Sequence, residues 1–130
     1  MRSRLLFISG SRQDARRLSR MLYAVPVALD HADDVKHART MLQRVTYDAI
    51  LTEADLRDGG WMDVLQLARE ARGEPKVIVT DPQADARFWA EALNLGAYDL
   101  LAQPYYEPEV RRILYNACSR RSEMVHHAGA

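Results

Sequence analysis

The sequence lacks several features that would define common classes of protein. It contains one cysteine, Cys118, which cannot pair within the chain and so excludes an internal disulfide framework. Its only lysines are Lys36 and Lys76, and nearly all of its positive charge is arginine. No apolar run has the length or the flanks of a signal peptide or a membrane span. These absences favour a cytoplasmic protein with no membrane partner.

An excess of one charge is also lacking. Lys and Arg together number 18 and Asp and Glu together number 18, so no overall field favours nucleic acid as a partner. Four histidines are present, and none has metal-ligand spacing with Cys118 or with a group of acids: His31, His37, His126 and His127. We therefore expect no metal and no other cofactor.

Short apolar segments alternate with amphipathic ones along the chain. The pattern predicts strands at 4–9, 25–30, 47–53, 76–80 and 98–102, and helices at 12–25, 32–45, 61–73, 84–96 and 108–124. Continuously apolar strands that alternate with helices are typical of a parallel sheet covered on both faces. We predict a three-layer α/β/α sandwich in which Pro26 marks an edge strand.

The predicted domain covers 1–122, and 123–130 has no pattern and is expected to fray. Gly73 and Gly96 fit the ends of the third and fourth helices, and Pro108 fits the first turn of the fifth.

Three segments carry a resemblance to a known family. "YDAILTEADLRDGGWMDVL" (47–65), "PKVIVTD" (75–81) and "EALNLGAYDLLAQPYYEPEV" (91–110) resemble the corresponding parts of the receiver domain of two-component response regulators. The resemblance extends over about 3–120. It implies a flavodoxin-like (CheY-like) fold with a five-stranded sheet in the order 2-1-3-4-5 and five helices.

The resemblance also implies where a phosphorylation site would lie. Receivers use an aspartate after the third strand, an acidic pair that holds Mg²⁺, a hydroxyl residue and a lysine before a proline. The corresponding residues here are Glu53, the pair Ser9 and Gly10, Thr80, Gln103 and Pro104. Only Thr80 and Pro104 match. The position of the family's aromatic switch holds Leu100.

Phosphoryl transfer needs positive charge around the transferred group, which Mg²⁺ and lysine supply. Ser9 and Gly10 bring no carboxylate, Gln103 is neutral, and Glu53 is one methylene longer than aspartate. We therefore predict a pseudo-receiver with no catalytic residue, which acts by binding proteins without being phosphorylated. One hypothesis is that Glu53 reaches toward Thr80 and imitates the phosphorylated state; the other is that it points into water or pairs with an arginine.

Two alternatives stay open. Asp55 or Asp58 could accept a phosphoryl group, although both are expected to be solvated loop acids. Ser9 to Arg12 could bind an anion or cofactor at a helix N-terminus, although serine and glycine are also ordinary capping residues.

Partner binding is expected on the face made by the fourth helix, fifth strand and fifth helix, which such receivers use for docking and dimerisation. The candidates are Trp89, Tyr98, Leu100, Tyr105 and Tyr115. An apolar spacing from Val110 to Met124 would suit a lead into an output domain. Separately, Arg12, Arg16 and Arg20 form a basic stripe beside Arg17 on the first helix, which could dock on an acidic partner or simply be solvated.

Overall fold

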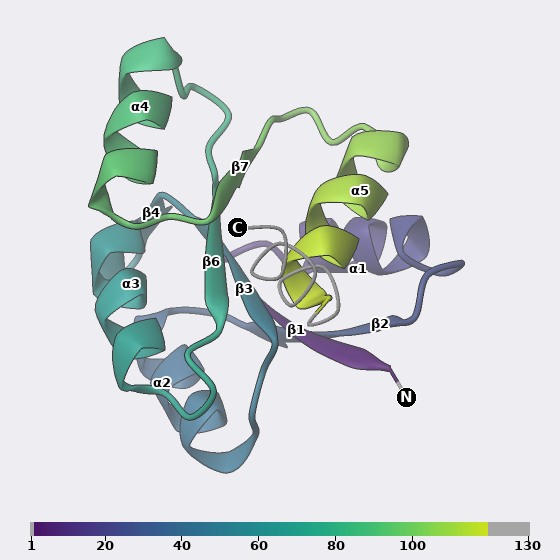
Figure 1. The fold of residues 1–130 in the computed structure, drawn as a ribbon, viewed down its shortest axis with the longest axis horizontal. Helices are drawn as coiled ribbons and strands as arrows, with labels where there is room; N and C mark the ends of the chain where they lie inside the picture. Colours follow the sequence, from purple (N-terminus) through teal and green to yellow (C-terminus); the bar gives the residue numbers. More distant parts are fainter. Residues whose placement is uncertain (1, 120–130) are drawn as a thin grey trace, which may run out of the picture.

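The computed structural model describes residues 2–119, and its central feature is a parallel sheet (Figure 1). The strands are β1 (Ser3–Ile8), β2 (Val27–Ala32), β3 (Ala49–Glu53), β6 (Lys76–Thr80) and β7 (Asp99–Leu101). Their order in the sheet is β2-β1-β3-β6-β7, and every neighbouring pair is parallel. The predicted order 2-1-3-4-5 is confirmed.

Helices cover both faces of this sheet, as predicted. Helices α1 (Arg12–Met21) and α5 (Glu107–Cys118) lie on one side, and α2 (Val35–Arg44), α3 (Trp61–Glu70) and α4 (Ala86–Leu95) lie on the other (Figure 1). Within residues 2–119, no helix is long and apolar enough to cross a membrane.

Each face of the sheet has its own hydrophobic core. Side chains of β1 alternate between them: Phe7 belongs to the same core as Leu114 of α5, while Ile8 belongs to the same core as Val64 of α3. This alternation follows from the two-residue period of a strand. All four side chains are fully buried, so both faces hold the central strand in place.

Some helix boundaries differ from the prediction. Helix α1 ends at Met21 rather than Val25, because Pro26 disfavours helical backbone in the residue before it. Pro26 itself precedes β2 and accepts a hydrogen bond from the Ser3 amide through its carbonyl, 2.9 Å away. Helix α4 ends at Leu95, and Gly96 follows it as the C-cap. The φ of Gly96, +119°, is the left-handed conformation that glycine permits. Helix α5 ends at Cys118 rather than at 124, because Ser119 follows it in extended backbone. The predicted tail lies outside the described residues.

A small hairpin after β3 was not predicted. Its strands β4 (Asp55–Leu56) and β5 (Gly59–Gly60) pair antiparallel before α3 begins. A Cβ atom on Gly59 would lie 2.6 Å from the Asp63 carboxylate, and one on Gly60 would lie 2.9 Å from the Ala54 carbonyl oxygen. The backbone contact requires glycine at position 60, whereas at position 59 the contact is with the end of the Asp63 side chain, which can move.

A polar cluster on the α2 side of the sheet involves Asp30, Tyr47 and Arg4. The Tyr47 hydroxyl donates to the Asp30 carboxylate at 2.6 Å, and the Arg4 guanidinium donates to it at 2.8 Å. Partial burial by itself raises the pKa of Asp30, but the two hydrogen bonds outweigh burial and leave the pKa below its ordinary value of 3.8. Asp30 is therefore stabilised in its charged form in the folded state.

We predict that this cluster contributes to acid sensitivity. Because the folded pKa of Asp30 is below the unfolded one, its contribution is present above about pH 4 and is lost as pH falls through the folded pKa. Asp30→Asn should lower stability at pH 7 and flatten its decline below pH 4, as measured by urea unfolding across this range. An unchanged pH dependence in the variant would contradict this role.

Candidate functional site at the carboxyl edge of the sheet

The parallel strands bring the predicted site residues to one edge of the sheet. Glu53 ends β3 and is paired in register with Thr80, which ends β6. Ser9 and Gly10 follow β1, and Gln103 and Pro104 follow β7. Ligand sites of open α/β sheets lie at this edge. The sequence thus located the candidate site, and the contacts within it determine what it can do.

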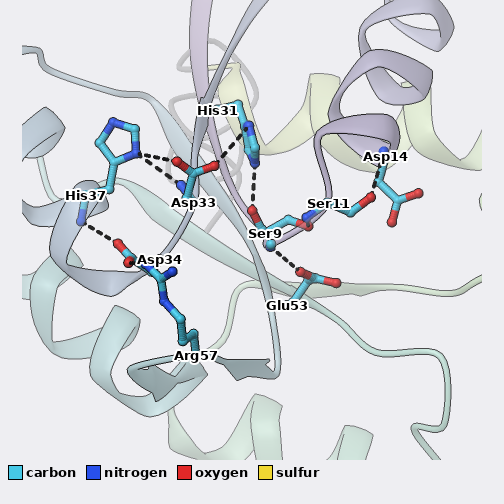
Figure 2. Close-up of polar contacts among 10 residues, drawn as sticks. Ser9, Ser11, Asp14, His31, Asp33, Asp34, His37, Glu53 and Arg57 are labelled. Carbon is cyan, nitrogen blue, oxygen red and sulfur yellow. Dashed lines mark hydrogen bonds and ion pairs between the residues drawn. The ribbon is translucent and has the colours of Figure 1, made fainter.

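Glu53 contacts the loop after β1. Its carboxylate Oε1 accepts a hydrogen bond from the Gly10 backbone amide at 3.1 Å, and the side chain is half-buried (Figure 2). No arginine or lysine pairs with it in the part of the chain that the structure describes. The loop amide is therefore the group that orients this carboxylate.

Thr80 forms a separate pair with Gln103. The buried Thr80 hydroxyl donates to the Leu101 carbonyl oxygen at 2.8 Å and accepts from the Gln103 amide Nε2 at 3.0 Å. Its hydrogen-bonding capacity as a donor is thus fully used. The hypothesis that Glu53 reaches toward Thr80 is wrong for this structure, because each side chain is engaged with other groups.

The loop from Ser9 to Arg12 is held by its own side chains. The buried Ser9 hydroxyl accepts from the Ser11 backbone amide at 2.9 Å. The backbone carbonyl oxygen of Ser9 accepts from His31 Nε2 at 2.7 Å (Figure 2). The Ser11 hydroxyl accepts from the Asp14 amide at 3.1 Å and caps α1. The Gly10 amide already donates to Glu53, and the Ser11 amide already donates to the Ser9 hydroxyl. An anion bound here would compete with Ser9 for the Ser11 amide and would face the Glu53 carboxylate. The capping interpretation of this segment therefore fits better than the anion site.

The residues at this edge do not fit a magnesium ion. Mg²⁺ prefers an octahedral shell of oxygen ligands that includes carboxylates. Glu53 brings one carboxylate at the end of β3, and the acidic-pair positions hold Ser9 and Gly10. Across residues 2–119, no cluster of three His, Cys, Asp or Glu residues could hold a metal ion. Lys76 starts β6, at the opposite end from the site, and lies over the Tyr98 ring at 5.2 Å.

Asp58 is an exposed loop acid, as predicted, but it also holds the start of α2, which was not predicted. Its two carboxylate oxygens accept from the backbone amides of Val35 at 2.9 Å and Lys36 at 3.0 Å, at the start of α2. Asp34, the N-cap of α2, accepts from the His37 amide and pairs with Arg57 (Figure 2). Asp55 is exposed in β4.

The buried end of the site contains Tyr105, whose placement also corrects the prediction. Tyr105 is 9% exposed and Leu100 is 5% exposed, so neither presents a contact surface to a partner. The buried Tyr105 hydroxyl makes no hydrogen bond of good geometry within residues 2–119. Burial raises its pKa to about 12, and the nearby Thr80 hydroxyl lowers the pKa by a smaller amount. A buried, unpaired hydroxyl costs free energy.

Tyr105→Phe is accordingly expected to keep or increase stability. Removing the unpaired hydroxyl relieves a desolvation cost of about 1 kcal/mol while the ring continues to pack. Chemical unfolding of the variant should give an equal or higher midpoint. A loss above about 1 kcal/mol would indicate that the hydroxyl has a structural partner.

Exposed aromatic side chains remain on α4, on α5 and directly before β7. Trp89 is 36% exposed, Tyr98 45% and Tyr115 43%. Leu93 and Tyr106 are also exposed, and Tyr106 was not among the predicted residues. The consecutive tyrosines at 105 and 106 were the available signal, because only one of two neighbours in extended backbone can point into the core.

The strand order and the helix layers define a CheY-like fold, and fold and sequence together support a receiver domain of response regulators. The response regulator protein PilR of Pseudomonas aeruginosa is 29% identical over 91 residues, which are 70% of this chain and 20% of that protein. The acid tolerance regulatory protein ActR of Rhizobium meliloti is 28% identical over 123 residues, 92% of this chain and 61% of that protein. The chain thus spans only part of these relatives.

Solved structures agree on the fold. A signal receiver domain from Vibrio parahaemolyticus has a TM-score of 0.86 at 18% identity and covers 100% of this chain and 99% of that one. The chemotaxis response regulator CheY4 of Vibrio cholerae has a TM-score of 0.79 at 14% identity, covering 90% and 99%. The beryllofluoride-activated NtrC4 receiver domain dimer has a TM-score of 0.80 at 19% identity, covering 88% and 95%. No known protein-family profile matches the chain.

Proposed function

We propose that the chain is a pseudo-receiver, a cytoplasmic signalling module that binds protein partners without being phosphorylated and without Mg²⁺. It is not an enzyme in this proposal. The observation that carries it is the hydrogen bond between Glu53 and the Gly10 amide, at an edge where the acidic-pair and lysine positions hold Ser9, Gly10 and Gln103 and where residues 2–119 form no metal-binding group of acids or histidines.

The charge balance of the edge supports this proposal. A transferred phosphoryl group needs nearby cations to neutralise its oxygens. The groups around Glu53 are the neutral Ser9, Thr80 and Gln103, and the last two bond to each other at 3.0 Å. A phosphoryl group on Glu53 would therefore meet no compensating positive charge from these three side chains. Instead, hydrogen bonds connect the end of β3 to the loop after β1 and the end of β6 to the loop after β7.

The surface of α4, β7 and α5 is the proposed contact face. Trp89, Tyr98 and Tyr115 present exposed aromatic area there, and aromatic residues are enriched at interfaces. We propose that this face binds a partner protein or a second copy of the chain. The domain would span 1–122, and an output domain beyond it is a further possible partner, since the matched relatives are longer.

Phosphorylation independence is testable by NMR of the labelled protein. Mg²⁺ and then beryllofluoride, a mimic of a bound phosphoryl group, are added to the folded chain. We expect no saturable shifts in the amides of Gly10, Glu53 and Thr80. Saturable, Mg²⁺-dependent shifts at these three positions would contradict the proposal.

The contact face is testable by sedimentation velocity over a range of concentrations. For self-association, we expect a concentration-dependent dimer that Trp89→Ala and Tyr115→Ala weaken. Met62→Ala serves as the control, because Met62 is 53% exposed but lies on α3. A protein that is monomeric at all concentrations excludes self-association and leaves a separate partner for this face.

A further inference from the structure

A groove lies between α1 and the edge strand β2, away from the face of α4, β7 and α5. It consists of two hollows of about 440 Å³ and about 240 Å³ that share Ser19 and Leu29. The first hollow is lined by three arginines of α1 and by Leu29 and His31 of β2. The second is lined by the end of α1, by Tyr23 and by the first residues of β2. We call this surface the edge groove. Strand β2 ends the sheet here, beside α1 (Figure 1).

The charge of the edge groove has one sign. Its lining contains Arg2, Arg12, Arg16 and Arg20 but no aspartate or glutamate. In the described range, none of these arginines pairs with a carboxylate, whereas Arg17 beside them lies 3.9 Å from Asp14. The chain is neutral overall, so this is a local concentration of unpaired positive charge.

The arrangement does not stabilise the helix that carries it. Arg12, Arg16 and Arg20 are spaced four residues apart, and like charges at this spacing repel one another. Arg12 also occupies the first turn of α1, where the helix dipole disfavours a cation. Leu18 and Ala15 provide the packing of α1 against the sheet. The stripe therefore costs stability in the isolated domain and would be relieved by an anionic ligand.

The floor of the groove is apolar. Leu29 lines both hollows, and Leu22, Val27 and the 88% exposed Tyr23 line the second one. The lining includes most of β2, so the groove follows an extended strand. This shape and charge match a chain with carboxylates on one side and apolar groups on the other.

We propose that the edge groove binds an acidic, extended segment of a partner protein. The carboxylates of the segment pair with Arg12, Arg16 and Arg20, while its apolar side chains cover Leu29 and the ring of Tyr23. Single-stranded nucleic acid is the less suitable occupant, because stacking of its bases needs several aromatic rings. Apart from His31, the lining contains one aromatic residue, Tyr23. This surface is separate from the proposed face of α4, β7 and α5.

The test uses a short fluorescein-labelled peptide in which glutamate alternates with valine, titrated with the chain and followed by anisotropy. We expect saturable binding that salt weakens. The double variant R16E/R20E should bind about tenfold more weakly, since two exposed ion pairs are lost. The matched control R39E/R44E reverses the same charge on α2, where Glu70 lines the neighbouring hollow, and should bind like the unmodified chain.

Several outcomes would overturn the proposal. They are the absence of peptide binding, an equal loss in both double variants, or tighter binding of a labelled single-stranded oligonucleotide of equal charge. A peptide-induced NMR shift map of the unmodified chain gives a result that does not depend on variants folding. Shifts confined to 12–20 and 27–31 support the edge groove, and shifts elsewhere exclude it.

Discussion

Replacing Trp61 with alanine is expected to lower the free energy of unfolding by about 3 kcal/mol. Trp61 is 8% exposed at the start of α3, and its ring meets Phe88 of α4 edge to face, with centroids 5.8 Å apart. Helix α4 otherwise buries Ala92. The tryptophan is therefore the main aromatic connection between α4 and the core.

The measurement is urea unfolding combined with hydrogen exchange. Exchange should accelerate most in α4, because loss of the indole leaves Phe88 without its partner. Met62→Ala is the control, since Met62 neighbours Trp61 but is 53% exposed, and its effect should stay within about 0.5 kcal/mol. Equal losses in the two variants, or uniform exchange along the chain, would contradict a specific link between α3 and α4.

Asp58→Ala is expected to lower stability by about 2 kcal/mol. The substitution removes the acceptor for two α2 amides, at 2.9 Å and 3.0 Å, and removes a negative charge at a helix N-terminus. Asp58→Asn should lose less, because its amide oxygen can still accept one of these bonds.

Asp55→Ala provides the comparison for Asp58. Asp55 is exposed two residues before Arg57 in the same hairpin, and its removal should change stability by less than about 0.5 kcal/mol. Thermal and urea unfolding of the variants would distinguish the roles. If Asp58→Ala is as stable as Asp55→Ala, Asp58 does not hold α2 in solution.

The sequence predicted those parts of the fold that depend on local pattern. The apolar segments around Phe7, Ile50 and Ile78 and the helices between them determine a covered parallel sheet, and the observed strand order agrees. The sequence also placed Glu53 and Thr80 at the same edge, because parallel strands end together.

The contacts that could not be predicted join residues far apart in the chain. No local rule indicates that Asp58 caps a helix that starts at Val35, or that Glu53 meets the Gly10 amide instead of Thr80. The choice between Tyr105 and Tyr106 as the buried ring depends on the backbone after Pro104. These details depend on the packed arrangement of several elements, which a pattern along one segment does not contain.

The most direct test of the central claim is the intact mass of the chain after incubation with Mg²⁺ and acetyl phosphate. The unmodified chain and the variants Glu53→Asp and Asp55→Ala are compared with a receiver known to be phosphorylated under the same conditions. We predict no added phosphoryl mass on the unmodified chain or on either variant, because Ser9, Gly10 and Gln103 still provide neither metal ligands nor a cation. A phosphoryl adduct on the unmodified chain would contradict the account, and its loss in Asp55→Ala would identify the acceptor.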